Sequence, residues 1–338
     1  MAAHPSQTTA PTPNSAFRGL GYLDSRHDVL TLEFTVQVVH DNVGIGEDES
    51  KSALESAGVA DTPHARRHAK RDRAKHRHKL RPPEEKTITV QLAQDTTALH
   101  SRKGDTGSVL WRACTDFAQM VLRRWYARAT DSLFDRARLS QARVVELGAG
   151  TGLLSILLSP IVRHYTVTDI AELVPLLSKN LTLNNIPHSK PRTAPHSRSQ
   201  VAPTQDEVRV DALDWLTIHN APPAARHTLL DSYAPLDLIL VVDCIYHPSL
   251  LPPLVTTIDA LAERGRTVVV VVVELRAEDV IREFLELWLR AGHEGEGSGD
   301  ETWEIWHANI DELLDGPYAV WVGWKKPPDK ETAWSIKV

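Results

Sequence analysis

A glycine-rich turn between two apolar segments is the part of this chain best suited to bind a nucleotide-like cofactor. Residues 144–154 read as a buried strand, a tight turn and the start of a helix. Glycines let backbone amides approach a ligand closely, and the free amides at a helix N-terminus attract polar groups. Glu146 either touches the cofactor or only holds the turn. The candidate cofactor contacts here are Glu146, Gly148, Ala149 and Gly150.

The spacing of the glycines argues against a dinucleotide. In the G-x-G-x-x-G fingerprint the third glycine leaves room for a pyrophosphate, but the corresponding position, counted from Gly148, holds Leu153. NAD is therefore disfavoured. The run E-L-G-A-G-T-G instead resembles the first motif of the S-adenosylmethionine-dependent methyltransferases, where a small residue such as Ala149 lets the loop lie against the cofactor.

A carboxylate follows the next predicted strand, which covers residues 165–168 and leads into Asp169. An acid at the tip of the neighbouring strand can accept hydrogen bonds from both ribose hydroxyls of a nucleotide. We therefore assign Asp169 to the ribose. The alternative is that Asp169 only caps the following helix, expected over residues 171–183, because aspartate is common at helix N-caps.

The pair Asp214 and Trp215 follows a third predicted strand, at 207–212. Ligands of open α/β sheets bind at the carboxyl edge, where this pair must lie. The indole of Trp215 can stack on an adenine ring, and the carboxylate of Asp214 can accept a hydrogen bond from the adenine amino group. Both residues are therefore candidate cofactor contacts.

The segment after the fourth predicted strand, 237–242, supplies the candidate catalytic residues. The backbone of Val242 is expected to face the cofactor, and Asp243 and Tyr246 lie just beyond it. Two other interpretations stay open. Asp243 could simply cap a helix over 249–261, and Tyr246 could be an aromatic residue at the rim of the site.

The elements that must position these residues alternate along the chain, which predicts an α/β fold of the Rossmann-like kind, a parallel sheet with helices on both faces. Two late segments, 302–307 and 318–324, are expected to close the sheet as a hairpin-like pair. The valine run at 268–273 suits a central strand buried on both faces. The predicted strands are 143–147, 165–168, 207–212, 237–242 and 267–274, and the helices are 110–127, 153–158, 171–183, 249–261 and 277–290.

Two alternating segments precede this domain. Apolar residues alternate with polar ones from Leu32 to Val38 and again from Ile88 to Leu92, which predicts a half-buried pair of strands. We expect a disordered tail over 1–18, a β extension over 19–110 with a charged disordered insertion at about 41–85, a catalytic domain over 111–328 with a disordered loop at about 188–206, and a C-terminal tail over 329–338.

Several motifs together resemble the fungal ribosomal lysine N-methyltransferase 5 family, part of methyltransferase family 16. They are Gln94–Leu99 with Ser101–Trp111, the glycine motif, Asp214–Trp215 and the D-C-I-Y run at Asp243–Tyr246. The resemblance covers the chain from about residue 19 onward, apart from two charged loops. It implies a seven-stranded methyltransferase sheet with an antiparallel last strand, S-adenosyl-L-methionine as cofactor, and monomethylation of a lysine in 60S ribosomal protein L1.

Trp111 completes the set of candidate contacts, since its indole offers a flat apolar wall and an N–H that can reach the methionine end of the cofactor. The alternative is an ordinary core aromatic at a helix start. For a lysine acceptor, forming the neutral amine at pH 7 requires about 4.6 kcal/mol. A buried apolar channel lowers this requirement, and Tyr246 can orient the amine lone pair towards the methyl group.

Composition narrows the setting. The chain has 338 residues, two cysteines and no long apolar run at its N-terminus, which predicts a protein of a reducing compartment, the cytoplasm or else the nucleus. Its longest apolar run falls well short of the roughly 20 residues that span a bilayer, so no membrane contact is expected. No apolar heptad calls for a dimer, so we expect a monomer.

A basic run, His64–Arg81, holds nine Lys or Arg residues against one Asp in a chain of net charge −6. Contact with RNA or the ribosome is one interpretation, and a solvated disordered insertion is the other. Its histidines lack cysteine or carboxylate partners at ligand spacing, so no metal site is predicted.

The acceptor is not fixed by the fold, because one fold hosts many functions. A nucleic-acid or small-molecule methyltransferase and a non-catalytic, ribosome-associated cofactor-binding protein are the alternatives. The D-C-I-Y run is similar to the D-P-P-Y motif of nucleic-acid amino-methyltransferases, but Cys244 and Ile245 replace both prolines. This weakens the case for a base as substrate, since the clamp that holds a flipped base is lost.

Overall fold

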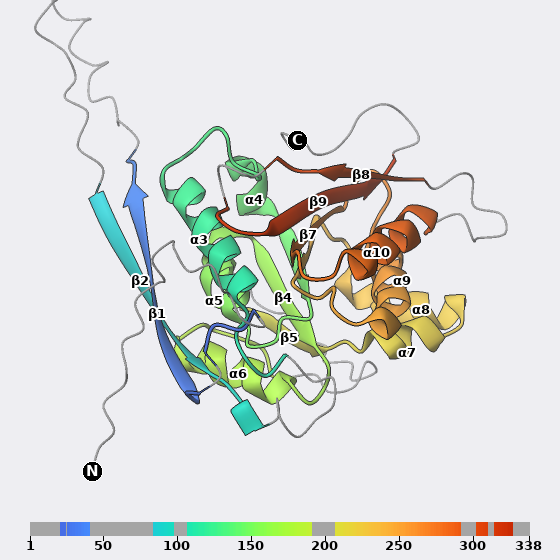
Figure 1. The fold of residues 1–338 in the computed structure, drawn as a ribbon, viewed down its shortest axis with the longest axis horizontal. Coiled ribbons are helices and arrows are strands. Elements are labelled where there is room, and N and C mark those ends of the chain that lie inside the picture. Colours follow the sequence, from blue (N-terminus) through green and yellow to red (C-terminus); the bar gives the residue numbers. More distant parts are fainter. Residues whose placement is uncertain are drawn as a thin grey trace, which may run out of the picture.

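The computed structural model describes residues 21–24, 26–40, 84–97, 107–190, 207–291, 302–309 and 314–326. The expected tails, the basic run and most of both expected loops lie outside these residues. The described residues form a seven-stranded sheet with helices on both faces and a separate two-stranded ribbon (Figure 1).

The central sheet has the strand order β5-β4-β3-β6-β7-β9-β8. Strand β9 runs antiparallel to β7, and β8 runs antiparallel to β9. The prediction of a seven-stranded sheet that is closed by a hairpin-like pair and whose last strand runs antiparallel is thus confirmed. The bounds are β3 Arg143–Leu147, β4 His164–Asp169, β5 Arg209–Ala212, β6 Leu238–Val242, β7 Val268–Glu274, β8 Trp303–His307 and β9 Tyr318–Lys325.

Helices cover both faces of this sheet (Figure 1). Strand β7 shows why two apolar layers are needed, since all seven of its residues are buried and successive valines belong to opposite core clusters. One face is covered by α3 (Arg112–Tyr126), α4 (Arg136–Gln141), α5 (Leu153–Leu158) and α6 (Val174–Leu183), and the other by α7 (Trp215–Asn220), α8 (Pro223–Leu230), α9 (Leu251–Leu261) and α10 (Glu278–Arg290).

The strand order reverses between β3 and β6. From β3 the chain winds outward through β4 to β5, and from β6 it winds the opposite way to β7. At such a switch point the loops at the carboxyl ends of the strands diverge and leave a crevice, which is where open α/β sheets bind ligands. Every candidate residue predicted after a strand therefore lies along one edge.

Four of the five predicted helices begin one to three residues later than the sequence pattern indicated, and in two of them a proline marks the start. The helix expected from residue 171 begins at Val174, and the helix expected from residue 249 begins at Leu251 after a short 3-10 turn, Pro248–Leu250. Each has a proline within its first two helical positions. Proline fits there because it lacks the N–H that would be unpaired anyway, so it marks the start more sharply than apolar spacing does.

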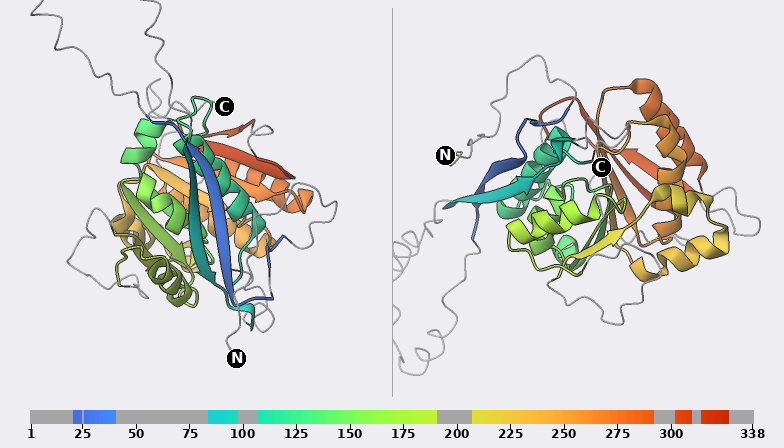
Figure 2. Two further views of the ribbon diagram at one scale, coloured as in Figure 1. Left: turned by 90° about the vertical axis from the view of Figure 1, so that its left-hand side faces the viewer. Right: turned by 90° about the horizontal axis from the view of Figure 1, so that it is seen from below.

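The ribbon pairs β1 (Val29–Val38) with β2 (Glu84–Ala93) in antiparallel register, as expected from the alternation. Its apolar face packs against the domain, with β1 next to α3 and β2 next to α6 (Figure 2). The side-chain amide of Asn180 in α6 exchanges two hydrogen bonds with the backbone of Ala93. The amide of Asn184, the C-cap residue of α6, does the same with Gln91. On α3, the side-chain amide of Gln119 donates a hydrogen bond to the backbone carbonyl of Thr35 in β1.

Candidate functional site

The glycine turn after β3 adopts backbone angles that suit glycine. Gly148, Gly150 and Gly152 have φ of 67°, 57° and 78°, in the left-handed region that side chains disfavour. A Cβ on Gly150 would lie 2.8 Å from the carbonyl oxygen of Gly107, and one on Gly148 would lie 2.7 Å from Sγ of Cys244. The turn is thus closed in from two sides, by the segment before α3 and by the loop after β6.

A cavity of about 840 Å³ lies over this turn at the carboxyl edge. The structure brings ten of the eleven candidate residues to its wall, from segments far apart in sequence. Glu146 is the exception. The ten are Trp111, Gly148, Ala149, Gly150, Asp169, Asp214, Trp215, Val242, Asp243 and Tyr246.

Asp169 ends β4 and is fixed to the glycine turn. Its Oδ2 accepts a hydrogen bond of 2.7 Å from the backbone N–H of Gly150, and its Oδ1 accepts one of 2.7 Å from Ile170. The alternative that Asp169 caps the next helix is wrong, because α6 has Leu173 as its N-cap. The carboxylate instead lines the cavity and orders the turn that forms its floor.

Trp215 lies above the same turn. A Cβ on Gly148 would approach the indole ring to 3.1 Å, so the ring and the turn are in near contact. The buried indole N–H of Trp215 has no hydrogen-bond acceptor among the described residues. A buried donor without a partner is costly, so this N–H is available to a ligand in the cavity.

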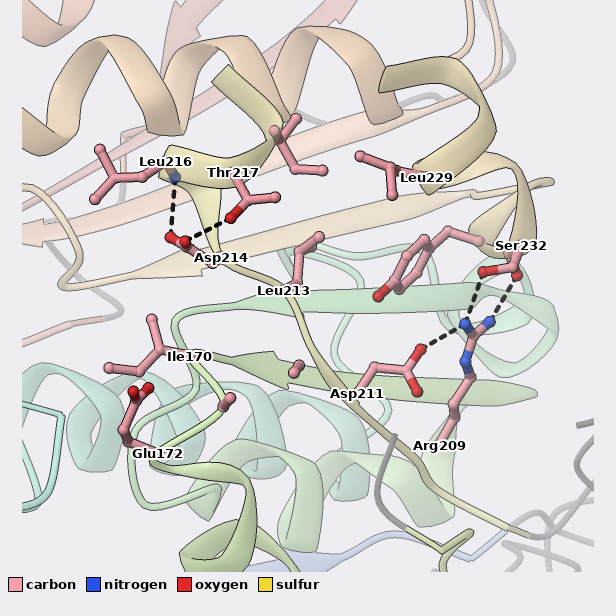
Figure 3. Close-up of a pocket in the computed structure, with 14 residues that line it drawn as sticks. Ile170, Glu172, Arg209, Asp211, Leu213, Asp214, Leu216, Thr217, Leu229 and Ser232 are labelled. Atoms are coloured by element: carbon pink, nitrogen blue, oxygen red, sulfur yellow. Dashed lines mark hydrogen bonds and ion pairs between the residues drawn. The ribbon is translucent and has the colours of Figure 1, made fainter. Parts of the chain in front are cut away.

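Asp214 is the N-cap of α7. Its Oδ1 accepts a hydrogen bond of 3.0 Å from Leu216 N–H, and its Oδ2 accepts one of 2.8 Å from the hydroxyl of Thr217 (Figure 3). A carboxylate oxygen can accept more than one hydrogen bond, so capping does not use up Asp214.

A second cavity of about 450 Å³ adjoins the first. The two share Ile170, Glu172, Leu213, Asp214 and Leu216 in their walls. In its wall Arg209 pairs with Asp211 at 2.5 Å and donates to Ser232 (Figure 3).

Asp243 follows β6 with φ of 58°, an unusual angle for a residue with a side chain. Its backbone N–H donates to Val272 in β7, and its carboxylate pairs with Arg276 at 2.7 Å. Burial raises its pKa, and the Arg276 charge opposes this. The alternative that Asp243 caps the following helix is wrong, because His247 is the N-cap of the 3-10 turn there. Tyr246 is 38% exposed and lines the cavity. This position agrees both with an aromatic residue at the rim and with a candidate catalytic residue.

Trp111 is the N-cap residue of α3 and lines the cavity rather than the core. The ring of Tyr22 meets its ring edge-on at 6.2 Å between centroids. The guanidinium of Arg276 lies over the indole at 4.9 Å from its centre. Sequence reasoning missed Arg276 and Glu274, although their position just after the all-valine strand placed them at the same edge as the other candidates.

Glu146 points into the core instead of the cavity. It is 3% exposed, and its carboxylate accepts a hydrogen bond of 2.8 Å from the hydroxyl of Tyr165. Burial raises the pKa of Glu146 from 4.5 to about 8, although the Tyr165 hydrogen bond opposes the change. Its backbone carbonyl accepts from Thr168, so this residue joins β3 to β4 below the turn.

We expect the stability of the protein to fall as the pH rises from 4.5 to about 8, because the folded state keeps the Glu146 proton that the unfolded chain releases. The favourable contribution is complete below pH 4.5 and is lost as the pH passes the folded pKa of about 8. Glu146→Gln keeps an acceptor for Tyr165 without the proton. This variant should therefore lose the pH-dependent part of the free energy of unfolding that Glu146 contributes, on the order of 5 kcal/mol across this range. Urea unfolding at several pH values measures this, with the exposed Glu33→Gln as control. Parallel curves for Glu146→Gln and the wild type would contradict the prediction.

None of the described helices is long and apolar enough to cross a membrane. The described residues contain no group of three or more His, Cys, Asp or Glu side chains arranged to hold a metal ion.

Comparison with known proteins gives a consistent result. The sequence model of the family described as lysine methyltransferase matches residues 91–290, more than half of the chain. The chain is 29% identical over 232 residues to a ribosomal lysine N-methyltransferase 5 of Eremothecium gossypii, covering 59% of this chain and 71% of that protein. It is 28% identical over 239 residues to the protein of the same name in Kluyveromyces lactis, covering 62% and 73%.

A relative with a different kind of name also matches. The chain is 30% identical over 199 residues to a diaminohydroxyphosphoribosylamino-pyrimidine deaminase of Schizosaccharomyces pombe. The match covers 58% of this chain and 41% of that protein, so the chain spans less than half of that relative's length.

Proposed function

Since the chain belongs to the lysine methyltransferase family, we propose that it transfers a methyl group from S-adenosyl-L-methionine to a lysine side chain of a ribosomal protein. The observation that carries this proposal is the cavity at the carboxyl edge, which gathers a glycine turn, an acid and an unpaired indole donor in one wall. These are the groups that a nucleoside-containing cofactor needs.

The residues present fit this cofactor. Asp169 offers carboxylate oxygens to the ribose hydroxyls, and Trp215 offers its ring to the adenine and its unpaired N–H to a cofactor acceptor. Asp214 can accept from the adenine amino group while it caps α7. Trp111, on the other side of the turn, walls the end proposed for the methionine part. The bound cofactor supplies an electrophilic methyl group on a sulfonium sulfur.

The segment at Asp243 and Tyr246 is proposed to receive the lysine. An amine enclosed between Trp111 and this loop is shielded from water, which favours its neutral, nucleophilic form. Tyr246 orients the amine, and the carboxylate of Asp243 is already held by Arg276 and therefore keeps a fixed direction. The contribution of the protein is mainly to position the amine and to exclude water.

For the substrate, we propose 60S ribosomal protein L1 and a single methylation, with the cytoplasm as the location. The support is the resemblance of the motifs and the name shared by the two relatives, ribosomal lysine N-methyltransferase 5. The nucleic-acid alternative has less support, because Cys244 is buried and its thiol donates to the carbonyl of Leu147 at 3.3 Å. Cys244, which occupies the position of the first proline in a base clamp, therefore holds the loop against the glycine turn instead.

The test is transfer of labelled methyl groups from S-adenosyl-L-methionine to purified large ribosomal subunits and to free protein L1, with wild-type enzyme and Tyr246→Phe. We expect label on a lysine of L1. Loss of the Tyr246 hydroxyl should lower the rate about 30-fold, equivalent to one hydrogen bond in the transition state, while binding of S-adenosylhomocysteine changes little. The control is Tyr126→Phe, which removes the hydroxyl of a partly buried tyrosine that does not line the cavity, and it should transfer normally.

The other outcomes separate the alternatives. Label that disappears on RNase treatment supports a nucleic-acid acceptor. Ribosome binding without any label supports a non-catalytic protein. If Tyr246→Phe transfers at the wild-type rate, the role assigned to Tyr246 is wrong even though L1 is methylated.

A further inference from the structure

Arg276 lies at the carboxyl edge of the sheet, two residues beyond the end of β7, and binds two buried acids at once. One guanidinium nitrogen lies 2.7 Å from Oδ2 of Asp243 and 2.7 Å from Oε2 of Glu274. The side chains of Asp243 and Glu274 are 2% and 5% exposed. Buried carboxylates so close together repel each other, and a shared cation offsets that repulsion.

The same guanidinium also contacts a second residue of the cavity wall. It lies over the indole of Trp111, at the start of α3, in the arrangement of a cation–π interaction. Gly21 packs against it so closely that a Cβ there would lie 2.2 Å from a guanidinium nitrogen. Arg276 thus joins the end of β7, the loop after β6 and the start of α3, although it does not itself line the cavity.

The backbone at Asp243 explains why this contact affects the site. A positive φ at a residue with a side chain is unfavourable by about 1 kcal/mol or more unless its surroundings hold it. At Asp243 the restraints are the Arg276 pair, the N–H of Glu274 donating to Oδ1 at 3.3 Å, and the donation of its own N–H to Val272. The direction in which the D-C-I-Y loop enters the cavity therefore depends on the side chain of Asp243.

We propose that Arg276 is a positioning residue for methyl transfer: it holds the Asp243 carboxylate and the Trp111 ring in the places where they line the cavity, without touching the substrate. This inference rests on the proposed function. The charged and titratable groups that face Asp243 are Arg276 and Glu274 from the β7 side, Cys114 from α3 and Cys244 from its own loop. Among them Arg276 is the cation.

The experiment compares Arg276→Met and Arg276→Lys with Arg266→Met. Arg266 is a matched control, because it pairs with Asp237 at 2.9 Å at the opposite ends of the same two strands. We expect Arg276→Met to bind S-adenosylhomocysteine within about threefold of wild type but to lose about 30-fold in kcat with little change in KM. The rise of kcat with pH should also be shifted to higher pH than in the wild type, because losing the nearby cation raises the pKa of Asp243.

Arg276→Lys restores the positive charge but not the planar guanidinium group. It should therefore regain part of the lost kcat and have a pH profile close to that of the wild type. It also serves as the test if Arg276→Met does not fold. Arg266→Met should keep the wild-type kcat. A wild-type kcat and pH profile in either Arg276 variant would overturn the proposal.

A crystal structure of an Arg276 variant gives a readout that does not depend on activity. We expect the Trp111 ring or the Asp243 carboxylate to leave the cavity wall. Finding both in place would overturn the inference. A wild-type enzyme that methylates no ribosomal lysine would instead count against the proposed function, and the displaced side chains would still support the positioning role.

Discussion

Replacing Asp169 with alanine is expected to weaken binding of S-adenosyl-L-methionine by about 100-fold or more and to reduce methyl transfer at micromolar cofactor below detection. Hydrogen bonds to a charged acceptor contribute about 1.5–3 kcal/mol each, and the ribose has two hydroxyls to donate. The variant also releases the backbone N–H of Gly150, which Asp169 now holds at 2.7 Å, so the glycine turn loses its anchor. Isothermal titration with S-adenosylhomocysteine measures the change.

The matched control for this variant is Asp135→Ala. Asp135 is the N-cap of α4 and accepts from the N–H of Arg138, so its loss should lower stability by about 1 kcal/mol. It does not line the cavity, and cofactor affinity should stay at the wild-type value. Asp169→Asn should fall between alanine and wild type because it keeps one acceptor. If Asp169→Ala binds the cofactor as tightly as Asp135→Ala does, the ribose assignment fails.

Gly150→Ala is expected to have a comparable effect by a different route. The new methyl group would lie 2.8 Å from the carbonyl oxygen of Gly107, a backbone atom that cannot rotate away. The residue would also keep a φ of 57°, which adds about 1 kcal/mol of strain. The turn or the facing segment must move, and we expect the affinity for the cofactor to fall about 100-fold because a shift of this size misplaces every amide of the turn.

Gly265→Ala separates strain from site geometry. Gly265 also has a positive φ, 69°, but it lies on the turn between α9 and β7, at the other edge of the sheet. Thermal unfolding should show that both glycine variants are destabilised, whereas a titration with S-adenosylhomocysteine should show weakened binding for Gly150→Ala alone. Equal affinities in the two variants would show that the approach to Gly107 does not control binding.

The residues proposed to hold the cofactor could be brought to one cavity wall from sequence alone, because local patterns determine where they lie. The glycine turn, Asp169 and the pair at Asp214 each follow a strand whose apolar residues mark its end, and parallel strands bring such ends to one edge. Glu146 shows the limit of that reasoning. A residue one step before the turn could face either the cavity or the core, and only the pairing of β3 with β4 places it beside Tyr165.

The strand-end pattern places Arg276 at the same edge but does not reveal its contacts. Its significance comes from contacts with residues 33 and 165 positions away in sequence, Asp243 and Trp111, and no local pattern records such contacts. The alternative that Asp169 and Asp243 cap helices was wrong for a related reason. Aspartate before a helix is compatible with capping, but tertiary partners, Gly150 and Arg276, hold both carboxylates. Asp214, which accepts hydrogen bonds from Leu216 and Thr217 of the helix that follows it, does cap that helix.

The asparagine amides on α6 have a further consequence for the two-stranded extension. A short ribbon outside the main sheet has unpaired backbone groups along its edges, and such edges invite strands from other molecules to add on. Here the backbone groups of Gln91 and Ala93 are already bonded to Asn184 and Asn180, and the carbonyl of Thr35 is bonded to Gln119. At these positions the ribbon offers no template for intermolecular strand addition, so the contacts that fasten it to the domain also protect the protein from aggregation.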